Sequence, residues 1–254
     1  MTVLKTPSEI DAIDAAGTVV ASVLAAVRAA AAPGVRPSDL DDLASDLIAQ
    51  AGAVSSFRGY HPQWAPGPYP AVLCVSVDDA VVHGIPSTDP LADGALLSVD
   101  FAVHLDGWCA DAAFSTVVGT PSPGDQALID TAERALAAGI AAAVPGARMG
   151  DVAHAIGSVA RGARYGMLAD HGGHGVGRAM HESPPVPNEG KAGKGPRLKP
   201  GLVIAIEPML THGTDRYRHD PDGWTLRTAD GSRAAHAEHT IAVTDAGPRV
   251  LTTR

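Results

Sequence analysis

Cysteine and positive charge are both scarce in this chain of 254 residues. Its two cysteines, Cys74 and Cys109, are too few for a disulfide framework, which favours a reducing compartment and a cytoplasmic protein. The chain has 19 Lys and Arg against 28 Asp and Glu, a net charge of −9. Binding to phosphates depends on clustered cations, so we expect no nucleic acid partner.

Long apolar runs and aromatic side chains are also few. The longest apolar run, residues 19–33, is broken by Ser22 and Arg28 and is shorter than the roughly 20 residues that a bilayer requires. We therefore expect a core helix there and no membrane span. Aromatic residues make up 4% of the chain but hydrophobic ones 45%, so small aliphatic side chains must fill the core. Closely packed helices on a sheet suit that composition.

Helical spacing and caps predict paired helices in each half of the chain. The first helix begins at the capping box of residues 6–9 and ends near Gly34, and the second runs from about Ser38 to Gly52. A third spans about residues 122–143. Residues 145–152 then repeat the Pro, Gly, Arg and Asp of 33–40 at one offset, 145 − 33 = 112. We expect one domain, residues 1–254, with related halves at about 1–120 and 121–254.

Strands and loops alternate with these helices. The blocks with strand-like composition are 71–82, 95–103, 108–118, 201–210, 224–228 and 235–244. The segments 61–68 and 183–200 are rich in Gly and Pro and are expected to be surface loops. The second carries the basic side chains Lys191, Lys194, Arg197 and Lys199. They are expected to be solvated, the alternative being a contact for an acidic partner.

Two acids occupy positions in predicted strands where charge is unusual. Asp100 and Asp111 flank the turn 104–107, and a four-residue turn would place them directly opposite each other. Like charges repel at that separation, so a cation is expected between them. The alternative is that one of them points to solvent.

The C-terminal half adds further groups of the same kind. Glu207 and Glu238 lie in apolar strand-like runs, and His174 lies in a Gly-rich stretch. Buried, unpaired carboxylates would have to be protonated, whereas two divalent cations would neutralise four of them. The oxygen-rich set with one nitrogen suits Mn, Fe(II), Co or Zn. Two such ions at about 3.5–4 Å would activate a water, which favours hydrolysis of an amide or ester.

Two more histidines follow short apolar runs. His83 and His181 would each be read alone as a capping or surface residue. Beside a metal pair, each could donate to a substrate carbonyl or amide. The remaining histidines are expected to be structural or to lie at the surface: His61, His104, His154, His171, His212, His219, His236 and His239.

Six ordered segments together resemble type I methionine aminopeptidases of peptidase family M24. The segments are 82–86 (VHGIP), 99–111, 173–182, 206–209 (IEPM), 222–225 and 237–240 (AEHT). Each is weak alone, but six in order over nearly the whole chain are specific. The resemblance implies the α+β pita-bread fold, with two pseudo-symmetric halves around a curved antiparallel sheet.

The same resemblance implies the roles of individual residues. The metal ligands would be Asp100, Asp111, His174, Glu207 and Glu238, with Asp111 and Glu238 bridging two divalent ions. A metal-bridging water or hydroxide would attack the carbonyl of an N-terminal Met, and a second metal can bind the free amine. In this scheme Glu207 handles the proton, His181 contacts the oxyanion and His83 lies near the scissile nitrogen. The methionine pocket would be lined by Tyr60, Tyr69, Cys74, Met180 and Trp224.

The chain departs from the family pattern in three places. Residues 61–68 form an insertion ahead of Tyr69, Met180 stands where an aromatic is common, and Asp78 replaces a usual Asn at an auxiliary monovalent-cation site. The first helix begins almost at the N-terminus, so no separate docking module is expected.

The resemblance also implies partners and alternatives. N-terminal Met peptides and nascent chains would be the substrates, with the ribosome exit region as a place of encounter, and the enzyme would act as a monomer. One alternative is an Xaa-Pro aminopeptidase or prolidase-like enzyme, but those relatives normally carry a sizeable N-terminal domain. Another is a non-catalytic pita-bread binding protein, against which the intact ligand set argues.

Overall fold

The computed structural model describes residues 2–253. Its helices are α1 (Pro7–Ala30), α2 (Pro37–Gln50), α3 (Pro123–Ala142) and α4 (Met149–Gly162). The strands before α3 are β1 (Val54–Ser55), β2 (Cys74–Val77), β3 (Ala80–Val82), β4 (Leu96–Leu105) and β5 (Trp108–Val117). Those after α4 are β6 (Gly166–Met167), β7 (Gly172–Gly175), β8 (Glu182–Pro187), β9 (Val203–Ile206), β10 (Met209–Thr211), β11 (Tyr217–His219), β12 (Leu226–Thr228), β13 (Ala234–His236), β14 (Glu238–Thr244) and β15 (Gly247–Val250).

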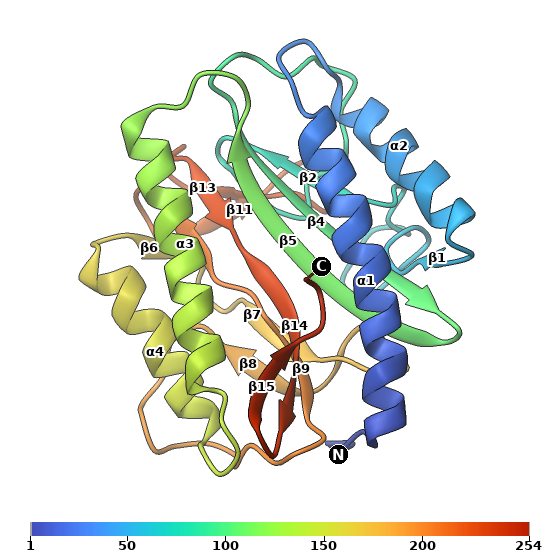
Figure 1. The fold of residues 1–254 in the computed structure, drawn as a ribbon. Coiled ribbons are helices and arrows are strands. Elements are labelled where there is room, and N and C mark those ends of the chain that lie inside the picture. The colour runs from blue at the N-terminus through green and yellow to red at the C-terminus, as the bar shows by residue number, and fades with distance from the viewer. Residues whose placement is uncertain (1, 254) are drawn as a thin grey trace.

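One antiparallel sheet of nine strands organises the molecule. Its order is β1-β4-β5-β14-β9-β7-β8, with β2 added on β4 and β15 on β14. The helices α1 and α2 cover the half that contains β4 and β5, while α3 and α4 cover the half that contains β9 and β14 (Figure 1). Two small three-stranded sheets, β13-β10-β6 and β11-β12-β3, complete the described structure. The fold is therefore α+β, as expected from the sequence.

Small residues allow the helices to lie close to the sheet. α1 buries Ile13, Ala16, Val20 and Val27 completely in the core that it shares with β4 and β5. A Cβ at Gly17 would overlap the backbone of Leu251, so the C-terminal segment packs directly on the helix. The low aromatic content is thus compatible with a dense core, because backbone and small side chains take the place of rings.

The helix α1 is longer than the apolar run in the sequence suggests. It spans 24 residues and is, by length and composition alone, sufficient to cross a membrane. The expectation that this segment is too short to span a bilayer is therefore wrong. Its buried face packs against β4 and β5, which is the arrangement of a core helix. The capping box at its start is confirmed, since Thr6 and Glu9 bond each other's backbone N–H groups.

The short helices α2 and α4 have the same local structure at their N-termini. Before each, an arginine N–H donates to an aspartate three residues on: Arg36 to Asp39 at 3.3 Å and Arg148 to Asp151 at 2.7 Å. The preceding Gly34 and Gly146 have φ of 89° and 87°. The echo at an offset of 112 residues, 148 − 36, therefore has the same local structure in both copies.

The predicted register of the β4–β5 hairpin is wrong. Leu105 pairs with Trp108, so the turn has two residues, Asp106 and Gly107, both with positive φ. Such a turn matches the twist of the strands better than the four-residue turn we expected. Asp100 consequently pairs with Ala113, and Asp111 with Ala102. The two acids are diagonal neighbours on one face and not directly opposite.

The segment 183–200 is only partly a surface loop. Its first residues belong to β8, where Val186 is completely buried and pairs with Gly173. The prolines concealed this strand, but β8 lies at the sheet edge, where proline is tolerated because one side needs no ladder hydrogen bonds. The basic side chains that follow are exposed, as expected: Lys191, Lys194, Arg197 and Lys199.

Candidate metal centre and substrate cavity

One cavity of about 350 Å³ collects every candidate site residue. At one end lie the acids and imidazoles: His83, Asp100, Asp111, His171, His174, His181, Glu207 and Glu238, of which His171 was expected only to be structural or to lie at the surface. The other walls are apolar or contain sulfur, and they include Tyr60, Tyr69, Cys74, Met180 and Trp224. The structure thus brings together groups that are spread over residues 60–238 of the chain.

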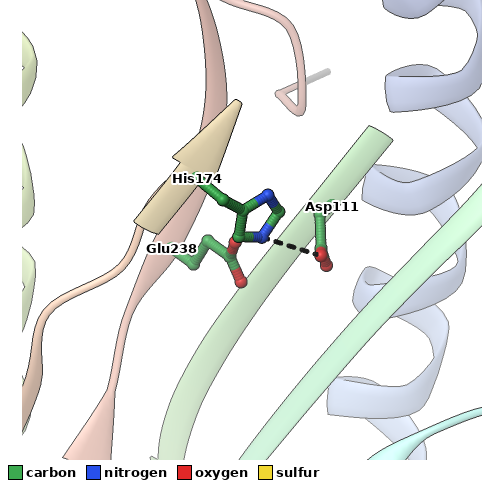
Figure 2. A group of neighbouring side chains, drawn as sticks. All are labelled: Asp111, His174 and Glu238. Atoms are coloured by element: carbon green, nitrogen blue, oxygen red, sulfur yellow. Dashed lines mark ion pairs between the residues drawn. The ribbon is translucent and has the colours of Figure 1, made fainter. Parts of the chain in front are cut away.

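The central strands of the sheet carry the charged end of the cavity. Asp111 comes from β5, Glu238 from β14 and His174 from β7, and Figure 2 shows their side chains converging. Their potential ligand atoms all lie within 4.8 Å of one another. Asp100 on β4 and Glu207, just after β9, line the same end. Adjacent strands in one sheet therefore place four carboxylates and an imidazole around one point.

The imidazole of His174 is oriented to bind a cation. Its Nδ1 donates to the carbonyl oxygen of Gly175 at 2.9 Å, which leaves a lone pair on Nε2. That Nε2 lies 3.6 Å from Glu207 Oε1 and 3.9 Å from Asp111 Oδ2. Burial lowers the pKa of His174 to about 3, so the ring is neutral at physiological pH, as a metal ligand must be.

The carboxylates at this end lack partners for their charge. Among residues 2–253, no hydrogen-bond partner reaches Asp100 Oδ1, Asp111 Oδ1 or Glu238 Oε1, although all three atoms are buried. Burial raises the pKa of Asp111 to about 7. Burial and the neighbouring acids raise the pKa of Asp100, Glu207 and Glu238 well above the usual range. Divalent cations would satisfy these oxygens, so the residues fit a metal centre.

Threonine and serine side chains fix the backbone behind the acids, which the sequence did not indicate. Thr240 Oγ1 donates to the carbonyl oxygen of Asp111 at 2.7 Å and accepts from its N–H at 3.0 Å. Ser115 Oγ makes the same pair of bonds to His236, both at 2.8 Å. These two bridges join β5 to β14 and β13, and so fix the distance between the strands that carry Asp111 and Glu238.

His236 was expected only to be structural or to lie at the surface, but it lies against two candidate metal ligands. The residue is 1% exposed, and its Nε2 lies 3.8 Å from Glu207 Oε2 and 3.9 Å from Glu238 Oε2. Burial lowers its pKa to about 3, so it faces both carboxylates as a neutral ring. In one continuous strand, His236 and Glu238 would lie on the same face, which would have indicated that they are neighbours. The strand is interrupted at Ala237, between β13 and β14, so this spacing was not a clear signal.

His181 is held at the cavity by its neighbours. Tyr60 Oη lies 3.1 Å from His181 Nδ1, and the rings of His181 and His174 are 4.3 Å apart between centroids. The adjacent Glu182 accepts from the N–H of Arg178 at 2.8 Å and pairs with the buried Lys5 at 2.6 Å. Burial lowers the pKa of His181, which keeps the ring neutral. The insertion 61–68 therefore does not remove Tyr60 from the cavity.

His83 occupies a constrained position just beyond β3. Its φ is 60°, a left-handed conformation that a non-glycine residue rarely adopts. Its ring is stacked on Trp64, with centroids 6.1 Å apart and planes 24° from parallel, and meets Trp224 edge-on at 6.4 Å. Burial lowers the pKa of His83 to about 3, and its buried Nδ1 has no partner in the described chain.

The apolar walls contain both expected and unexpected residues. Tyr69 is buried and donates its hydroxyl to the carbonyl oxygens of Gly84 and Leu73, so only its ring serves the cavity. Burial raises the pKa of Cys74 well above its usual value, so that side chain is a neutral thiol. Phe57 and Trp64 also line the cavity, although the sequence did not single them out.

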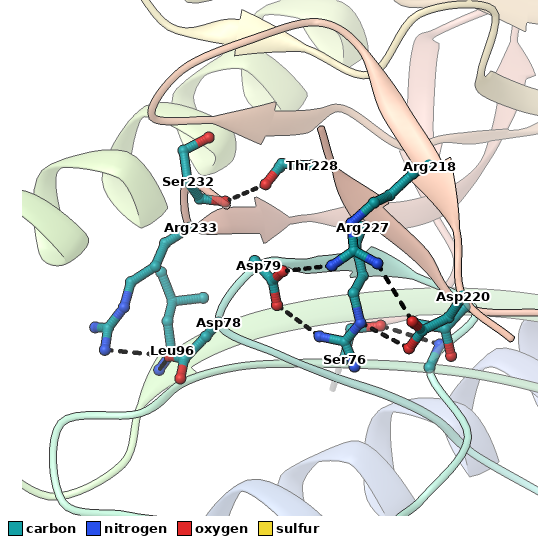
Figure 3. Close-up of polar contacts among 12 residues, drawn as sticks. Ser76, Asp78, Asp79, Leu96, Arg218, Asp220, Arg227, Thr228, Ser232 and Arg233 are labelled. Carbon is teal, nitrogen blue, oxygen red and sulfur yellow. Dashed lines mark hydrogen bonds and ion pairs between the residues drawn. The ribbon is translucent and has the colours of Figure 1, made fainter. Parts of the chain in front are cut away.

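The carboxylate of Asp78 already has a cationic partner. It accepts from the N–H of Leu96 at 3.0 Å and pairs with Arg233 at 3.2 Å (Figure 3). Arg233 also donates to Asp125 at 2.6 Å and to the carbonyl oxygen of Gly94 at 2.9 Å. A built-in guanidinium thus neutralises the acid that stands at the suggested monovalent-cation site.

Comparisons with known proteins agree with this geometry. The model of "metallopeptidase family M24" matches residues 11–245. The chain is 52% identical to methionine aminopeptidase 1 of Mycobacterium tuberculosis, covering 98% of this chain and 94% of that protein. It is 43% identical to the methionine aminopeptidase of Aquifex aeolicus, with 96% of both chains covered.

Solved structures separate the two branches of peptidases that the sequence left open. Methionine aminopeptidase from Thermotoga maritima superposes with a TM-score of 0.96 at 38% identity, and both chains are completely covered. Prolidase from Pyrococcus furiosus gives a TM-score of 0.77 at 21% identity, with 66% of its chain covered, which shows a shared fold only. The chain therefore has the pita-bread fold and belongs to metallopeptidase family M24, among the type I methionine aminopeptidases.

Proposed function

We propose that this methionine aminopeptidase removes the initiator methionine from nascent proteins whose second residue is small, and that it uses two divalent cations. One observation carries the proposal. A single cavity is lined by four carboxylates and a neutral imidazole, and its other walls are apolar and sulfur-containing side chains. Membership of the methionine aminopeptidases supports the reaction.

The metal ions would be held by Asp100, Asp111, His174, Glu207 and Glu238. Bound there, divalent cations would polarise the scissile carbonyl and lower the pKa of an attacking water. Oxygen-rich ligands with one imidazole accept Co, Mn, Fe(II) or Zn, and the supply of each metal then decides which one is bound.

Three side chains would act directly on the substrate. Tyr60 Oη lies 3.1 Å from Nδ1 of His181, and a hydroxyl that donates to this nitrogen would leave Nε2–H free to donate to the developing oxyanion. Glu207 lies within the ligand group and has a raised pKa, so it can take a proton from water and return it to the leaving amine. His83 is neutral and would orient the scissile amide nitrogen.

The methionine side chain would occupy the apolar end of the cavity. Cys74, Met180 and Trp224 offer polarizable sulfur and aromatic surfaces, which suit a thioether. Tyr69 lines the same pocket with its buried ring. We further propose that the protein is a monomer, and that it is located in the cytoplasm, a location that its two free, buried cysteines support.

Three peptides test this function. With saturating Mn²⁺ or Co²⁺, we expect cleavage of Met-Ala-Ser to exceed that of Leu-Ala-Ser and Ala-Pro-Ala by at least about 100-fold in kcat/KM, because a branched side chain or a short one fits the pocket poorly. Preference for Ala-Pro-Ala would instead support an Xaa-Pro peptidase.

The variant Asp111→Asn is the matched control for that assay. It keeps the size of the side chain but removes the charge of one proposed ligand, so metal content by elemental analysis and activity should be lost together. No cleavage of any peptide by a wild-type protein that retains metal would favour a binding protein.

A further inference from the structure

The segment 61–68 carries a large apolar side chain that no role yet explains. Trp64 is 56% exposed, yet its indole lines the same cavity as the candidate catalytic groups. Burying an indole contributes substantially to stability, so an exposed one at the mouth of a cavity marks a surface for a ligand.

The segment is held in place by contacts at its base and its centre. Tyr69 N–H donates to the carbonyl oxygen of Tyr60 at 2.8 Å, which closes the base of the loop. The N–H of Ala65 donates to Pro62 at 3.0 Å in a turn. Pro66 packs so closely on Gly223 that a Cβ there would overlap its ring. The insertion is therefore joined to the loop that carries Trp224.

Trp64 lies over two residues of the proposed substrate site. Its ring is stacked on His83 at a centroid distance of 6.1 Å and meets Trp224 edge-on at 5.0 Å. Trp224 and Tyr69 are 5.0 Å apart and almost completely buried, so they close the inner end of the pocket. The exposed Trp64 consequently stands at the outer end, beyond His83.

We infer that Trp64 is a specificity-determining residue for the amino acid that follows the methionine. The inference rests on the proposed function, in which His83 lies beside the scissile nitrogen. The Cα of the second residue is bonded to that nitrogen, and the closed inner end forces the chain outward past His83. The side chain of this second residue then meets the indole of Trp64, which limits the space for branched or long side chains.

Replacing the indole should relax this limit. Trp64→Ala removes a wall without changing any proposed ligand or proton donor. In a tight pocket, two substrates that differ by one methylene group differ in kcat/KM by roughly 10- to 200-fold. We therefore expect the ratio of kcat/KM for Met-Val-Ser to that for Met-Ala-Ser to rise about tenfold or more, and the ratio for Met-Leu-Ser to rise as well.

Two further variants make the experiment decisive. Trp64→Phe keeps a smaller ring and should raise the same ratios by less than Trp64→Ala does. Val54→Ala removes an exposed apolar side chain outside the cavity, 67% accessible in the fold, and should leave the ratios unchanged. Circular dichroism and metal content should be the same in all four proteins.

The outcomes separate this inference from the proposed function. Loss of kcat by a common factor for all peptides would mean that Trp64 only supports His83, and unchanged ratios would mean that it is a surface residue; either result overturns the inference. If the wild-type protein with metal bound fails to cleave Met-Ala-Ser, the proposed function itself is wrong.

Discussion

Two imidazoles in the cavity, His174 and His181, each have a neighbour bonded to one ring nitrogen. His174 donates Nδ1–H to the carbonyl of Gly175, and Tyr60 reaches Nδ1 of His181. Because the nitrogen that faces the substrate or metal is the other one, the partner determines whether Nε2 carries a lone pair or a proton. In the proposed function His174 would thereby be a ligand and His181 a donor, although both rings are neutral.

The hydroxyl of Tyr60 can be tested through this assignment. Tyr60→Phe keeps the aromatic wall but allows His181 to adopt the other tautomer, in which Nε2 has no proton to donate. One hydrogen bond is worth about 0.5–1.5 kcal/mol, so kcat should fall about 3- to 10-fold while metal content stays the same. Steady-state kinetics on Met-Ala-Ser measures it, and an unchanged kcat would contradict the donor role of His181.

His236 should act on metal affinity. Its neutral Nε2 can donate to the carboxylates of Glu207 and Glu238 and hold them toward the cations. Loss of such an outer partner typically weakens metal binding about 10- to 100-fold, so His236→Ala should raise the Kd for Mn²⁺ by that factor, and His236→Gln by less. Titration calorimetry measures the Kd.

The nearby His239 provides the control for His236. It is also a largely buried imidazole, but its Nδ1 bonds to Thr252 Oγ1 at 2.8 Å and it does not line the cavity. His239→Ala should therefore leave the Kd for Mn²⁺ close to that of the wild type. Equal effects of both variants would show that His236 acts only through the stability of the fold.

At the scale of elements, helices were predicted well because their signals are local. The capping box at Thr6 and the Pro-Gly echo specify helix starts within a few residues of sequence. The register of the β4–β5 hairpin was predicted wrongly, because His104 and Leu105 fit a turn as readily as a strand. The strands β7 and β8 are rich in Gly and Pro and form only through contacts with the rest of the sheet.

The candidate site shows the same difference between residues with a local sequence signal and residues that depend on contacts between distant segments. Asp100, Asp111, Glu207 and Glu238 could be selected because acids within apolar runs are conspicuous. Thr240, His236 and Trp64 were missed, because a threonine in a strand, a histidine near its end and a tryptophan in a loop are all ordinary in sequence. Thr240 and His236 gain a role only through the pairing of distant strands, and Trp64 only through the contacts of its loop with His83 and Trp224.

The packing of α1 against the C-terminal segment predicts the effect of a single methyl group. Gly17→Ala would insert a Cβ against the Leu251 backbone, and overpacking of this kind costs about 1–3 kcal/mol. Thermal unfolding should show Tm lower by several degrees. Gly162→Ala, whose Cβ would meet nothing within 4 Å, should leave stability equal or slightly higher. Equal losses in both variants would contradict the close approach.

At the scale of the whole molecule, the candidate metal centre lies where the two halves of the chain meet. Asp100 and Asp111 come from β4 and β5, whereas His174, Glu207 and Glu238 come from the strands that follow α4. The sheet joins them through the pairing of β5 with β14. Cations bound there would therefore stabilise the contact between the halves as well as the individual strands.

This position predicts how the stability of the metal-free protein depends on pH. Burial raises the pKa of Asp111 from 3.8 to about 7, and the pKa values of Asp100, Glu207 and Glu238 are also raised. The folded state thus keeps protons that the unfolded state releases. The free energy of unfolding of the metal-free protein should therefore fall as pH rises from about 4 to about 7. Each unit by which folding raises a pKa contributes about 1.4 kcal/mol to this fall.

Divalent cations should reverse that trend, because they bind the ionised carboxylates and displace the same protons. Urea unfolding with a chelator and with Mn²⁺, at both ends of this pH range, would measure the two slopes. The stabilisation by Mn²⁺ should grow with pH, and Asp111→Asn should flatten the slope in chelator, because one ionisable group is gone. A stabilisation by Mn²⁺ that is the same at both pH values would show that the cations bind elsewhere, away from these four acids.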